Sequence, residues 1–541
     1  MKSWKDQLRG LKGALRSSGC DKGQRDESPK FEFEPPPSWL ADTHSSSKNL
    51  STRNSVHKSS APDAVGASVD KPPTRPSELP SAPFKPRIDG KCSLVMPDWG
   101  EVGRSLQHPE HSGGRTTPMV ARIGVDFGTA FTKVAIRAGV DLVPVDWSAV
   151  TGDDSETGRY VVPGFIIRAP DGEFCWRSVA EADIKGNLKL PVMGIASADE
   201  CPLATVAYLA LVIRYARAFL FQNAQIERKL VERSLRWEMN IGCPTEPHES
   251  YKIVDRFRRI ARTAWSLAGK HQLNEQTVIT AWNLADCDTG LEVEPGVVPE
   301  FVAQIAGYLS SPQLMDGLHA LIDIGAATMD VATFNIVKQS DRASPPLIPI
   351  FFSAVRPLGT HYLRDNRHSK LGLDLSWNDA MPVEPADEFA LRNGKSLNEV
   401  VAVDENFIER IVRVIFNVID GTRTNRWGDP RSAAWTEGLP IFVTGGGANC
   451  VVYRQAIEAV QKEVRLRMEQ RPGHSKHFRL IQLNPISRNA RQLAVSGRLT
   501  VALGLTEDAE NIARVVPHRD IEPITYATRK RIDHTEHYGD R

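Results

Sequence analysis

One stretch of this sequence, Ile123–Ile136, combines the residue types that bind a phosphate together with its metal ion. Two apolar runs flank a tight glycine turn, which predicts a strand, a turn and a second strand. The turn would present backbone N–H groups and hydroxyls to an anion, and a carboxylate to a hydrated cation. The residues with these properties are Asp126, Gly128, Thr129, Ala130 and Lys133. Such turns also close ordinary hairpins, so the rest of the chain has to decide between the two interpretations.

A second stretch, Ala320–Val337, repeats this plan later in the chain. An apolar strand again leads into a glycine turn and a second strand. Its carboxylates, small residues and hydroxyl are Asp323, Gly325, Ala326, Ala327, Thr328 and Asp330.

A third stretch, Leu439–Ile457, predicts a strand that runs into three glycines, with a helix beginning near Asn449. The glycines are Gly445, Gly446 and Gly447. Glycines let a flat ligand lie against the backbone, and a helix N-terminus favours anionic oxygens.

Together, the three turns resemble the motifs of the actin-like ATPase superfamily, which includes actin, bacterial actins, sugar kinases and the DnaK-type heat-shock chaperones. DFGTAFTK is similar to the first phosphate loop, DIGAATMD to the second and VTGGGAN to the adenosine motif. The resemblance implies an α/β fold of the two-lobed, ribonuclease H-like kind, with an ATP cleft between the lobes. It covers about Val120–Leu505, within an ATPase domain expected at residues 119–515 and followed by a polar tail at 516–541.

Within the superfamily, the order of segments most resembles the nucleotide-binding domain of the DnaK-type (70 kDa class) chaperones. CPTEP, VVPEFVAQIAGYL and PLGTHYL are similar to segments of that domain. The resemblance implies ATP or ADP with Mg²⁺ as cofactors. By this resemblance, the magnesium ion and its waters would be positioned by Asp126, Asp323 and Asp330. Thr129 and Thr328 would contact phosphate, and Glu300 would help to place the attacking water. Lys189, or else Lys185, would lie beside the γ-phosphate.

Three departures from the chaperone pattern bear on function. Ala326 and Ala327 replace two glycines, and their methyl groups would crowd the phosphates, so slow hydrolysis is expected. Lys133 stands where actins carry a phosphate-contacting lysine. Only a short tail follows Gly504, so a chaperone that clamps peptides is not expected.

The N-terminal part has a different composition. Residues 1–16 place Trp4, Leu8, Leu11 and Leu15 on one face of a basic helix, which predicts docking to a protein partner or peripheral contact with a membrane. A helix packed on its own protein stays open as an alternative. Residues 17–118 are polar and proline-rich, which predicts a disordered extension with short binding motifs at Phe31–Leu40 and Lys91–Gly100.

Composition limits the remaining possibilities. A net charge of +1 argues against a dedicated nucleic-acid binder. The seven cysteines are scattered with no C-x-x-C pair, which fits the cytoplasm, and no secretory signal is evident. The longest apolar run, Leu203–Phe221, contains two arginines and predicts the start of a buried helix reaching about Arg233. A strand is expected near Val278–Ala281.

These observations favour a cytoplasmic nucleotide-dependent switch of the heat-shock-chaperone-like type, which reports to a protein partner through residues 1–118. Two other classes stay open. One is an actin-like filament-forming ATPase, and the other is a pseudo-ATPase scaffold that binds nucleotide without cleaving it.

Overall fold

A computed structural model describes residues 94–112, 117–156, 158–193, 201–285, 293–339, 341, 344–374, 383–424, 432–469, 479–483 and 496–521. The chain divides into two compact units, and all described residues belong to Glu78–Ile524. The amphipathic segment 1–16 and the motif Phe31–Leu40 lie outside the described residues.

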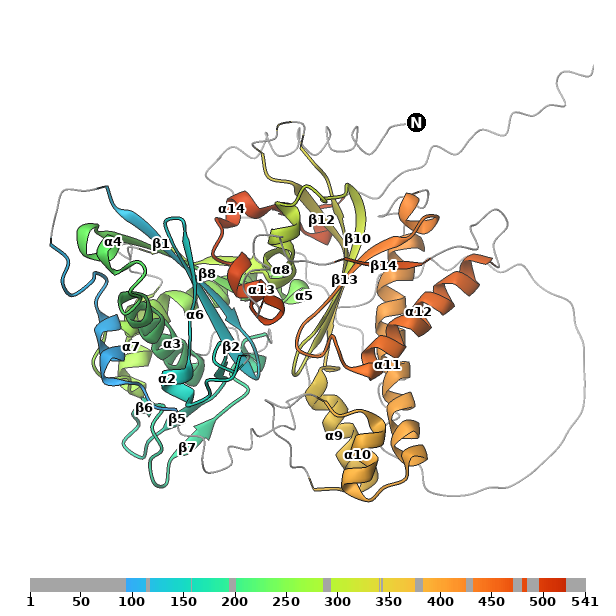
Figure 1. Ribbon diagram of the computed structural model, residues 1–541, viewed down its shortest axis with the longest axis horizontal. Coiled ribbons are helices and arrows are strands. Elements are labelled where there is room, and N and C mark those ends of the chain that lie inside the picture. Colours follow the sequence, from blue (N-terminus) through green and yellow to red (C-terminus); the bar gives the residue numbers. More distant parts are fainter. Residues whose placement is uncertain are drawn as a thin grey trace, which may run out of the picture. The chain divides into compact units, whose positions relative to one another are not determined.

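Two six-stranded sheets are built on one plan. In the first, the strand order is β3-β2-β1-β8-β9, with β4 beside β2. In the second it is β14-β13-β10-β11-β12-β15. Each sheet therefore has three antiparallel strands followed by two strands parallel to the first of them. Two copies of this ribonuclease H-like plan confirm the expected two-lobed α/β fold, and we call them the first and second lobes (Figure 1).

The first lobe begins with a short 3-10 helix and ends where β9 meets α8. Its strands are β1 Met119–Phe127, β2 Phe131–Ala138, β3 Asp141–Pro144, β4 Val162–Pro163, β5 Ile166–Arg168, β6 Phe174–Cys175, β7 Asp183–Lys185, β8 Leu235–Cys243 and β9 Gly296–Pro299. Its helices are η2 Asp98–Arg104, α2 Ser148–Thr151, η3 Leu190–Met193, α3 Leu203–Phe221, α4 Glu227–Glu232, α5 Thr245–His248, α6 Tyr251–Ala268 and α7 Glu275–Leu284.

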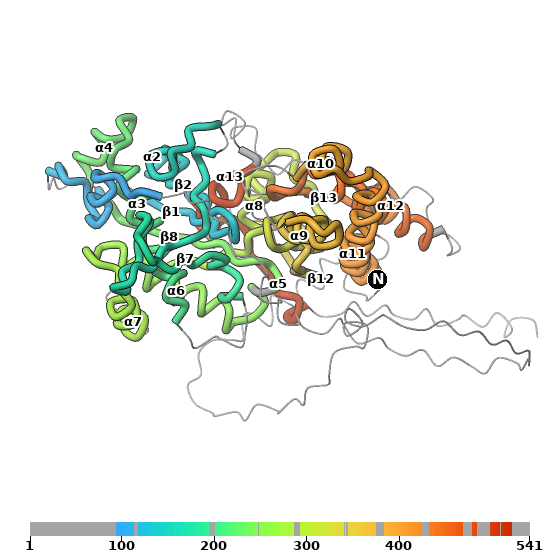
Figure 2. Tube along the Cα trace, turned by 90° about the horizontal axis from the view of Figure 1, so that it is seen from below, coloured from blue at the N-terminus to red at the C-terminus, as the bar shows by residue number. Residues whose placement is uncertain are grey.

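The second lobe carries a group of helices between its third and fourth strands (Figure 2). Its strands are β10 Gly317–Ile324, β11 Met329–Ile336, β12 Leu347–Arg356, β13 Leu439–Thr444, β14 Leu480–Leu483 and β15 Arg514–Val516. Its helices are α8 Glu300–Leu309, α9 Thr360–Leu371, α10 Ala386–Asn393, α11 Leu397–Thr424, η4 Ala433–Trp435, α12 Val451–Glu469, α13 Ser496–Gly504, α14 Ala509–Ile512 and η6 His518–Asp520.

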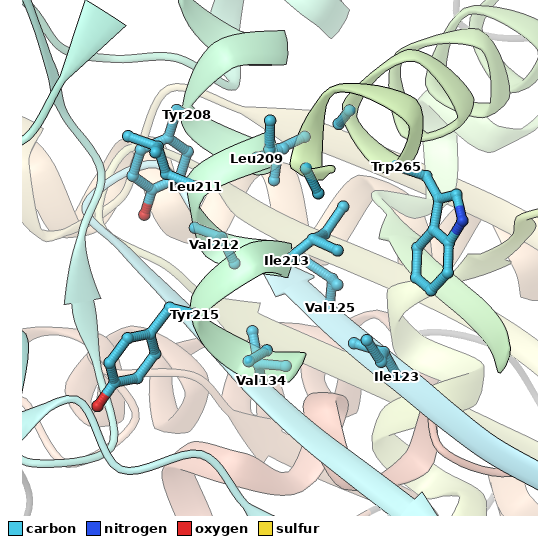
Figure 3. Packing of buried hydrophobic residues seen from close by; sticks show 14 of the residues in the cluster. Ile123, Val125, Val134, Tyr208, Leu209, Leu211, Val212, Ile213, Tyr215 and Trp265 are labelled. Atoms are coloured by element: carbon cyan, nitrogen blue, oxygen red, sulfur yellow. The ribbon is translucent and has the colours of Figure 1, made fainter. Parts of the chain in front are cut away.

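Helix α3 is the centre of the first core. Its side chains pack on Ile123, Val125 and Val134 of the β1–β2 hairpin and face Trp265 of α6 (Figure 3). It is the only helix in the described residues long and apolar enough to cross a membrane, and 83% of its most apolar window is buried inside the protein. The expected buried helix is confirmed as a core element that supports the first hairpin.

Two predicted elements differ from the structure. The helix that begins at Leu203 ends at Phe221, because the Asn223 side chain accepts a hydrogen bond from the Gln225 N–H and forms a turn before α4. The strand expected near Val278–Ala281 is part of helix α7. Reciprocal hydrogen bonds between Asn274 and Thr277 cap this helix and outweigh the β-branched run that suggested a strand.

The segment Leu94–Ser112 corrects the predicted extent of the disordered extension. Leu94 is buried, and the ring centroids of Trp99 and Tyr215 are 5.1 Å apart. Gly103 lies so close to α3 that a Cβ atom would come within 1.8 Å of the Arg214 carbonyl oxygen. The folded body therefore begins before Val120, and part of the predicted motif Lys91–Gly100 is packed against α3.

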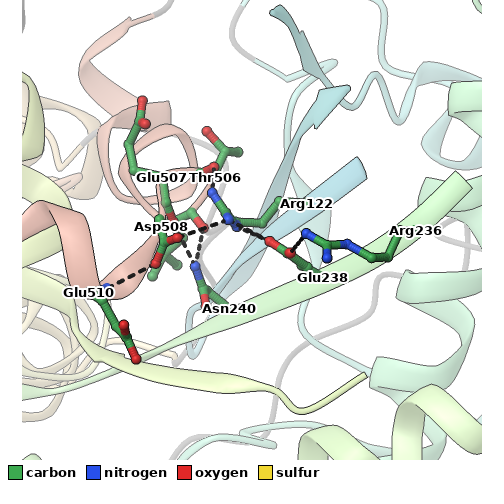
Figure 4. A network of polar contacts seen from close by, with 9 residues as sticks. Arg122, Arg236, Glu238, Asn240, Thr506, Glu507, Asp508 and Glu510 are labelled. Carbon is green, nitrogen blue, oxygen red and sulfur yellow. Dashed lines mark hydrogen bonds and ion pairs between the residues drawn. The ribbon is translucent and has the colours of Figure 1, made fainter. Parts of the chain in front are cut away.

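The segment after α13 contacts both sheets. The Asn240 side chain donates to the Leu505 and Glu507 carbonyls, and Arg122 donates to the Thr506 carbonyl (Figure 4). Further on, β15 pairs with β12, so this short segment links the first sheet to the edge of the second. The tail expected from residue 516 is thus structured as far as Ile521, which is buried.

Candidate functional site

The first hairpin places its charged residues beside each other at the turn. The β1–β2 register sets Asp126 opposite Lys133, and the Lys133 Nζ donates to Asp126 Oδ2 over 2.9 Å. Gly128, Thr129 and Ala130 form the turn, and the Gly164 N–H braces it by donating to the Ala130 carbonyl over 2.7 Å. Lys133, expected to contact phosphate, is paired with Asp126 in this structure.

The second hairpin is fixed by the start of helix α9. The carbonyls of Gly325, Ala326 and Ala327 accept hydrogen bonds of 3.1, 2.8 and 3.0 Å from the N–H groups of Thr360, His361 and Gly359. In a trans peptide, the N–H points opposite to the carbonyl of the preceding residue. The N–H groups that follow these carbonyls, at residues 326 to 328, therefore point away from α9 and form a set of donors for an anion.

The two alanines of this turn differ in exposure. Ala327 is buried, so its methyl group does not lie on the accessible surface of the turn, whereas Ala326 is partly exposed. Of the two alanines expected to crowd a phosphate, only Ala326 is partly exposed. Asp330, on the second strand, is opposite Asp323 in the register.

The third turn brings an open backbone next to Asp323. Strand β13 pairs with β10 so that Thr444 lies opposite Asp323. Gly445 has a φ of +85°, a conformation that favours glycine, and Gly447 packs on Ile324. Gly446 is exposed, and a Cβ there would meet nothing within 4 Å. Helix α12 begins at Val451, slightly later than predicted, so Asn449 is an exposed residue of the turn before the helix.

Glu300 and Lys189 form a buried ion pair. Glu300 is the first residue of α8, and its Oε1 is 2.5 Å from the Lys189 Nζ. Burial alone would lower the pKa of Lys189, but the attraction of Glu300 and then of Asp126 raises it overall, so the lysine is charged. Lys185 instead pairs with Asp183 in a more exposed position. The structure therefore brings Lys189, and not the alternative Lys185, to Glu300.

Burial and repulsion from neighbouring carboxylates raise the pKa values of Glu300, Asp323 and Asp330. For Glu300, burial is the main cause and Asp126 adds to it, while Lys189 opposes it. For Asp323, burial again dominates, Asp126 adds to it, and hydrogen bonds from Gln304 and Thr444 oppose it.

Asp330 is the third carboxylate whose pKa is raised. Burial raises its pKa to about 7, and Asp323 and Glu300 contribute to the shift. Its Oδ2 accepts the Thr245 N–H over 2.9 Å, whereas its buried Oδ1 has no hydrogen-bond partner among the described residues. A buried acidic group with an unused oxygen favours a cation, because added positive charge would ionise the carboxylates at less cost.

The acidic residues do not form a direct metal-binding cluster. Among the described residues, no three His, Cys, Asp or Glu side chains are placed to hold a metal ion together. That Asp126, Asp323 and Asp330 act through the water shell of a magnesium ion stays a prediction.

Three residues of this site were missed in the sequence. Gln304 donates to Asp323, Thr444 donates to the same carboxylate, and Gly242 leaves the space that Glu300 fills. Gln304 follows Glu300 by one helical turn, and Thr444 directly precedes the three glycines. These two sequence positions were the only signals available. Neither of them indicates a contact with Asp323, which only the folded chain brings close.

Comparison with known proteins adds limited information. No protein-family model matches the sequence, and no curated protein matches it. Among solved structures, it is similar to the ethanolamine utilization protein EutJ from Carboxydothermus hydrogenoformans, with 15% identity, a TM-score of 0.28, and coverage of 74% of this chain and 93% of that chain. It is also similar to MreB5 of Spiroplasma citri bound to ADP, with 13% identity, a TM-score of 0.34, and coverage of 71% and 94%. At such values neither neighbour's function can be transferred, and the site has to be judged from its own geometry.

Proposed function

We propose that this chain binds ATP with Mg²⁺, hydrolyses it slowly to ADP and phosphate, and acts as a nucleotide-dependent switch on a protein partner. The observation that supports this most is the meeting of the two hairpins. Asp323 lies opposite Asp330 in the second hairpin, and Asp126 of the first hairpin is close enough to affect both Asp323 and Glu300, which pairs with Lys189. Phosphoryl transfer requires this combination of charge neutralisation and a positioned water more than it requires covalent chemistry.

The chain's own groups divide into three roles in this proposal. The N–H groups at residues 326 to 328, with Thr129 and Thr328, would bind phosphate oxygens. The exposed backbone at Gly446 would lie against the adenosine. Asp126, Asp323 and Asp330 would hold the waters of Mg²⁺, which supplies positive charge when bound.

Glu300 is the residue that would orient the attacking water. Its raised pKa brings it closer to the range in which a carboxylate exchanges a proton with water at neutral pH. Lys189 holds its Oε1 in place, and Gly242 leaves room for its side chain. Lys189 therefore orients the Glu300 carboxylate, and the raised pKa of Glu300 makes that carboxylate a stronger base.

The partner-binding role is assigned to the N-terminal residues before Leu94. Helix η2, which contains the end of the predicted motif Lys91–Gly100, is packed on α3, so docking is assigned to the chain before it. Substituting Trp4→Glu and Leu8→Glu in the full chain, which introduces charge on the apolar face, is expected to abolish co-purification of a cytoplasmic protein partner while ATP binding stays intact. Unchanged co-purification would refute this assignment.

Isothermal titration of the full chain with ATP, with and without Mg²⁺, tests the main proposal. We expect binding that Mg²⁺ strengthens and that Asp126→Ala weakens, together with slow phosphate release that is lost in the same variant. Absence of ATP binding by the unaltered chain would refute the proposed function.

A nucleotide-binding scaffold without turnover is the second candidate. Two observations favour it: Ala326, in the phosphate turn, is partly exposed, and Lys133 is engaged by Asp126. Intact ATP binding with phosphate release no faster than in Asp126→Ala would decide for this candidate. Filaments seen by electron microscopy only with ATP would instead identify an actin-like polymer.

A further inference from the structure

Gln304 is a buried amide at a position where packing alone would be satisfied by an apolar residue. It lies on α8 and is 3% exposed. Its Nε2 donates to Asp323 Oδ1 over 3.3 Å, and its buried Oε1 has no hydrogen-bond partner among the described residues. Burying an amide costs free energy unless it is hydrogen-bonded, so the bond to Asp323 is the clearest reason for a glutamine here.

A second donor reaches the same oxygen of Asp323 from a different element. The Thr444 hydroxyl, at the end of β13, is 3.2 Å from Asp323 Oδ1. The following residue, Gly445, approaches so closely that a Cβ atom there would be 2.5 Å from this oxygen. Three neighbours, from α8, β13 and the turn that follows β13, thus surround Oδ1.

Holding one oxygen of a carboxylate at two points fixes the plane of the whole group. A carboxylate has two oxygens, and both donors occupy Oδ1. The other oxygen, Oδ2, is therefore held in one orientation. The charged groups that act on Asp323 are Asp126, Lys133, Glu300 and Asp330, all from the same site.

We propose that Gln304 and Thr444 are positioning residues that hold Asp323 Oδ1 so that Oδ2 serves the hydrated magnesium ion of the nucleotide. This inference rests on the proposed function. It adds two residues to the site and gives the two oxygens of Asp323 different roles. In this inference the two residues influence the ion through Asp323, although the Thr444 hydroxyl also lies 3.4 Å from the Ile322 carbonyl. Their removal should therefore weaken the contribution of Mg²⁺ more than the affinity for the nucleotide itself.

The test measures ATP affinity of the full chain by calorimetry with and without Mg²⁺ and compares the ratio of the two constants. Gln304→Leu keeps the size of the side chain and removes the amide. We expect the Mg²⁺-dependent gain in affinity to fall about tenfold, the loss typical of a hydrogen bond to a charged group. The matched control is Gln276→Leu, which changes a glutamine on the surface helix α7 and should leave the ratio unchanged.

A double substitution and a spectroscopic measurement separate positioning from simple packing. If both residues act through one carboxylate, Gln304→Leu combined with Thr444→Val should lose less than the product of the two single losses. With Mn²⁺ in place of Mg²⁺, the electron paramagnetic resonance signal of the bound ion should change in Gln304→Leu and not in Gln276→Leu. A merely structural role would leave that signal unchanged.

The outcomes distinguish this inference from the proposed function. ATP binding whose Mg²⁺ dependence and Mn²⁺ signal are the same in Gln304→Leu as in the unaltered chain would overturn the inference alone. No ATP binding by the unaltered chain would overturn the proposed function, and the inference with it.

Discussion

The position of Glu300 can be tested through a glycine that is distant from it in the sequence. Gly242 lies near the end of β8, and a Cβ atom at this position would be 2.8 Å from Glu300 Cγ and 3.2 Å from its Oε1. Carbon atoms in ordinary contact are about 3.5–4.0 Å apart. Gly242→Ala would therefore displace the Glu300 side chain by roughly 1 Å, unless the strand itself moves.

A displacement of this size has a large expected effect on hydrolysis. A misplacement of about 1 Å in a catalytic group can lower a rate by about 100-fold. The added methyl group should also lower the free energy of unfolding by about 1–3 kcal/mol, the usual cost of overpacking. Nucleotide affinity should change little, because the groups proposed to bind phosphate and adenosine are on other elements.

Single-turnover phosphate release with saturating Mg-ATP measures this effect, with ATP affinity and urea unfolding measured on the same samples. Ile241→Val is the control, because neighbouring residues of a strand face opposite sides of the sheet. It should cost about 0.5–1.5 kcal/mol of stability without reaching Glu300. If Gly242→Ala is folded and releases phosphate at the parent rate, Glu300 does not act from its position in this structure.

Three further predictions concern the stability of the body that holds the site. Asp404→Ala removes the carboxylate that the buried Arg367 guanidinium donates to over 2.8 and 2.6 Å and leaves it only the Glu384 carbonyl as an acceptor among the described residues, which should cost about 3–5 kcal/mol in urea unfolding. Burial raises the pKa of Glu249 to about 7, so the folded chain keeps a proton that the unfolded chain has lost, and stability should decrease as the pH rises through this window. Glu249→Gln should therefore raise the melting temperature at about pH 8 and not at about pH 5; an equal change at both would contradict the shift. Gly103→Ala should push η2 off α3 and speed proteolytic cleavage near Asp98–Arg104, and an unchanged digestion pattern would contradict the tight packing described above.

The hairpins of the site could be predicted from the sequence because each is local. In Ile123–Ile136 and Ala320–Val337, the apolar alternation and the glycine turn lie within a few residues of each other, and the register of both hairpins follows. The two-lobed fold was expected only through the resemblance that these two hairpins and the third glycine turn carry. The prediction of a strand near Val278–Ala281 was wrong. Its β-branched residues suggested a strand, whereas the cap at Asn274 and the burial of Val278 and Trp282 on one face favour a helix.

The remaining features depend on contacts between distant parts of the chain. Lys189 could be expected near the site only by resemblance, and its partner Glu300 is brought to it by the fold. Gln304 belongs to helix α8, and the sequence of its inward face predicts only apolar packing. The amide has a partner because β10 places Asp323 next to it in the fold. Leu94–Ser112 has a composition typical of a linker, yet its small residues allow it to pack closely against α3.

The two alanines of the second turn have different surroundings in the folded chain. In the sequence, Ala326 and Ala327 stand where glycines are expected and so argue against efficient hydrolysis. In the folded chain, the turn is held by three carbonyl bonds to the start of α9, and neither alanine has a positive φ that would require glycine. Because Ala327 is also buried, the obstruction is reduced to one methyl group, that of Ala326. The choice between a slow ATPase and a scaffold therefore depends on that methyl group and on whether Glu300 can orient a water, not on the conformation of the turn.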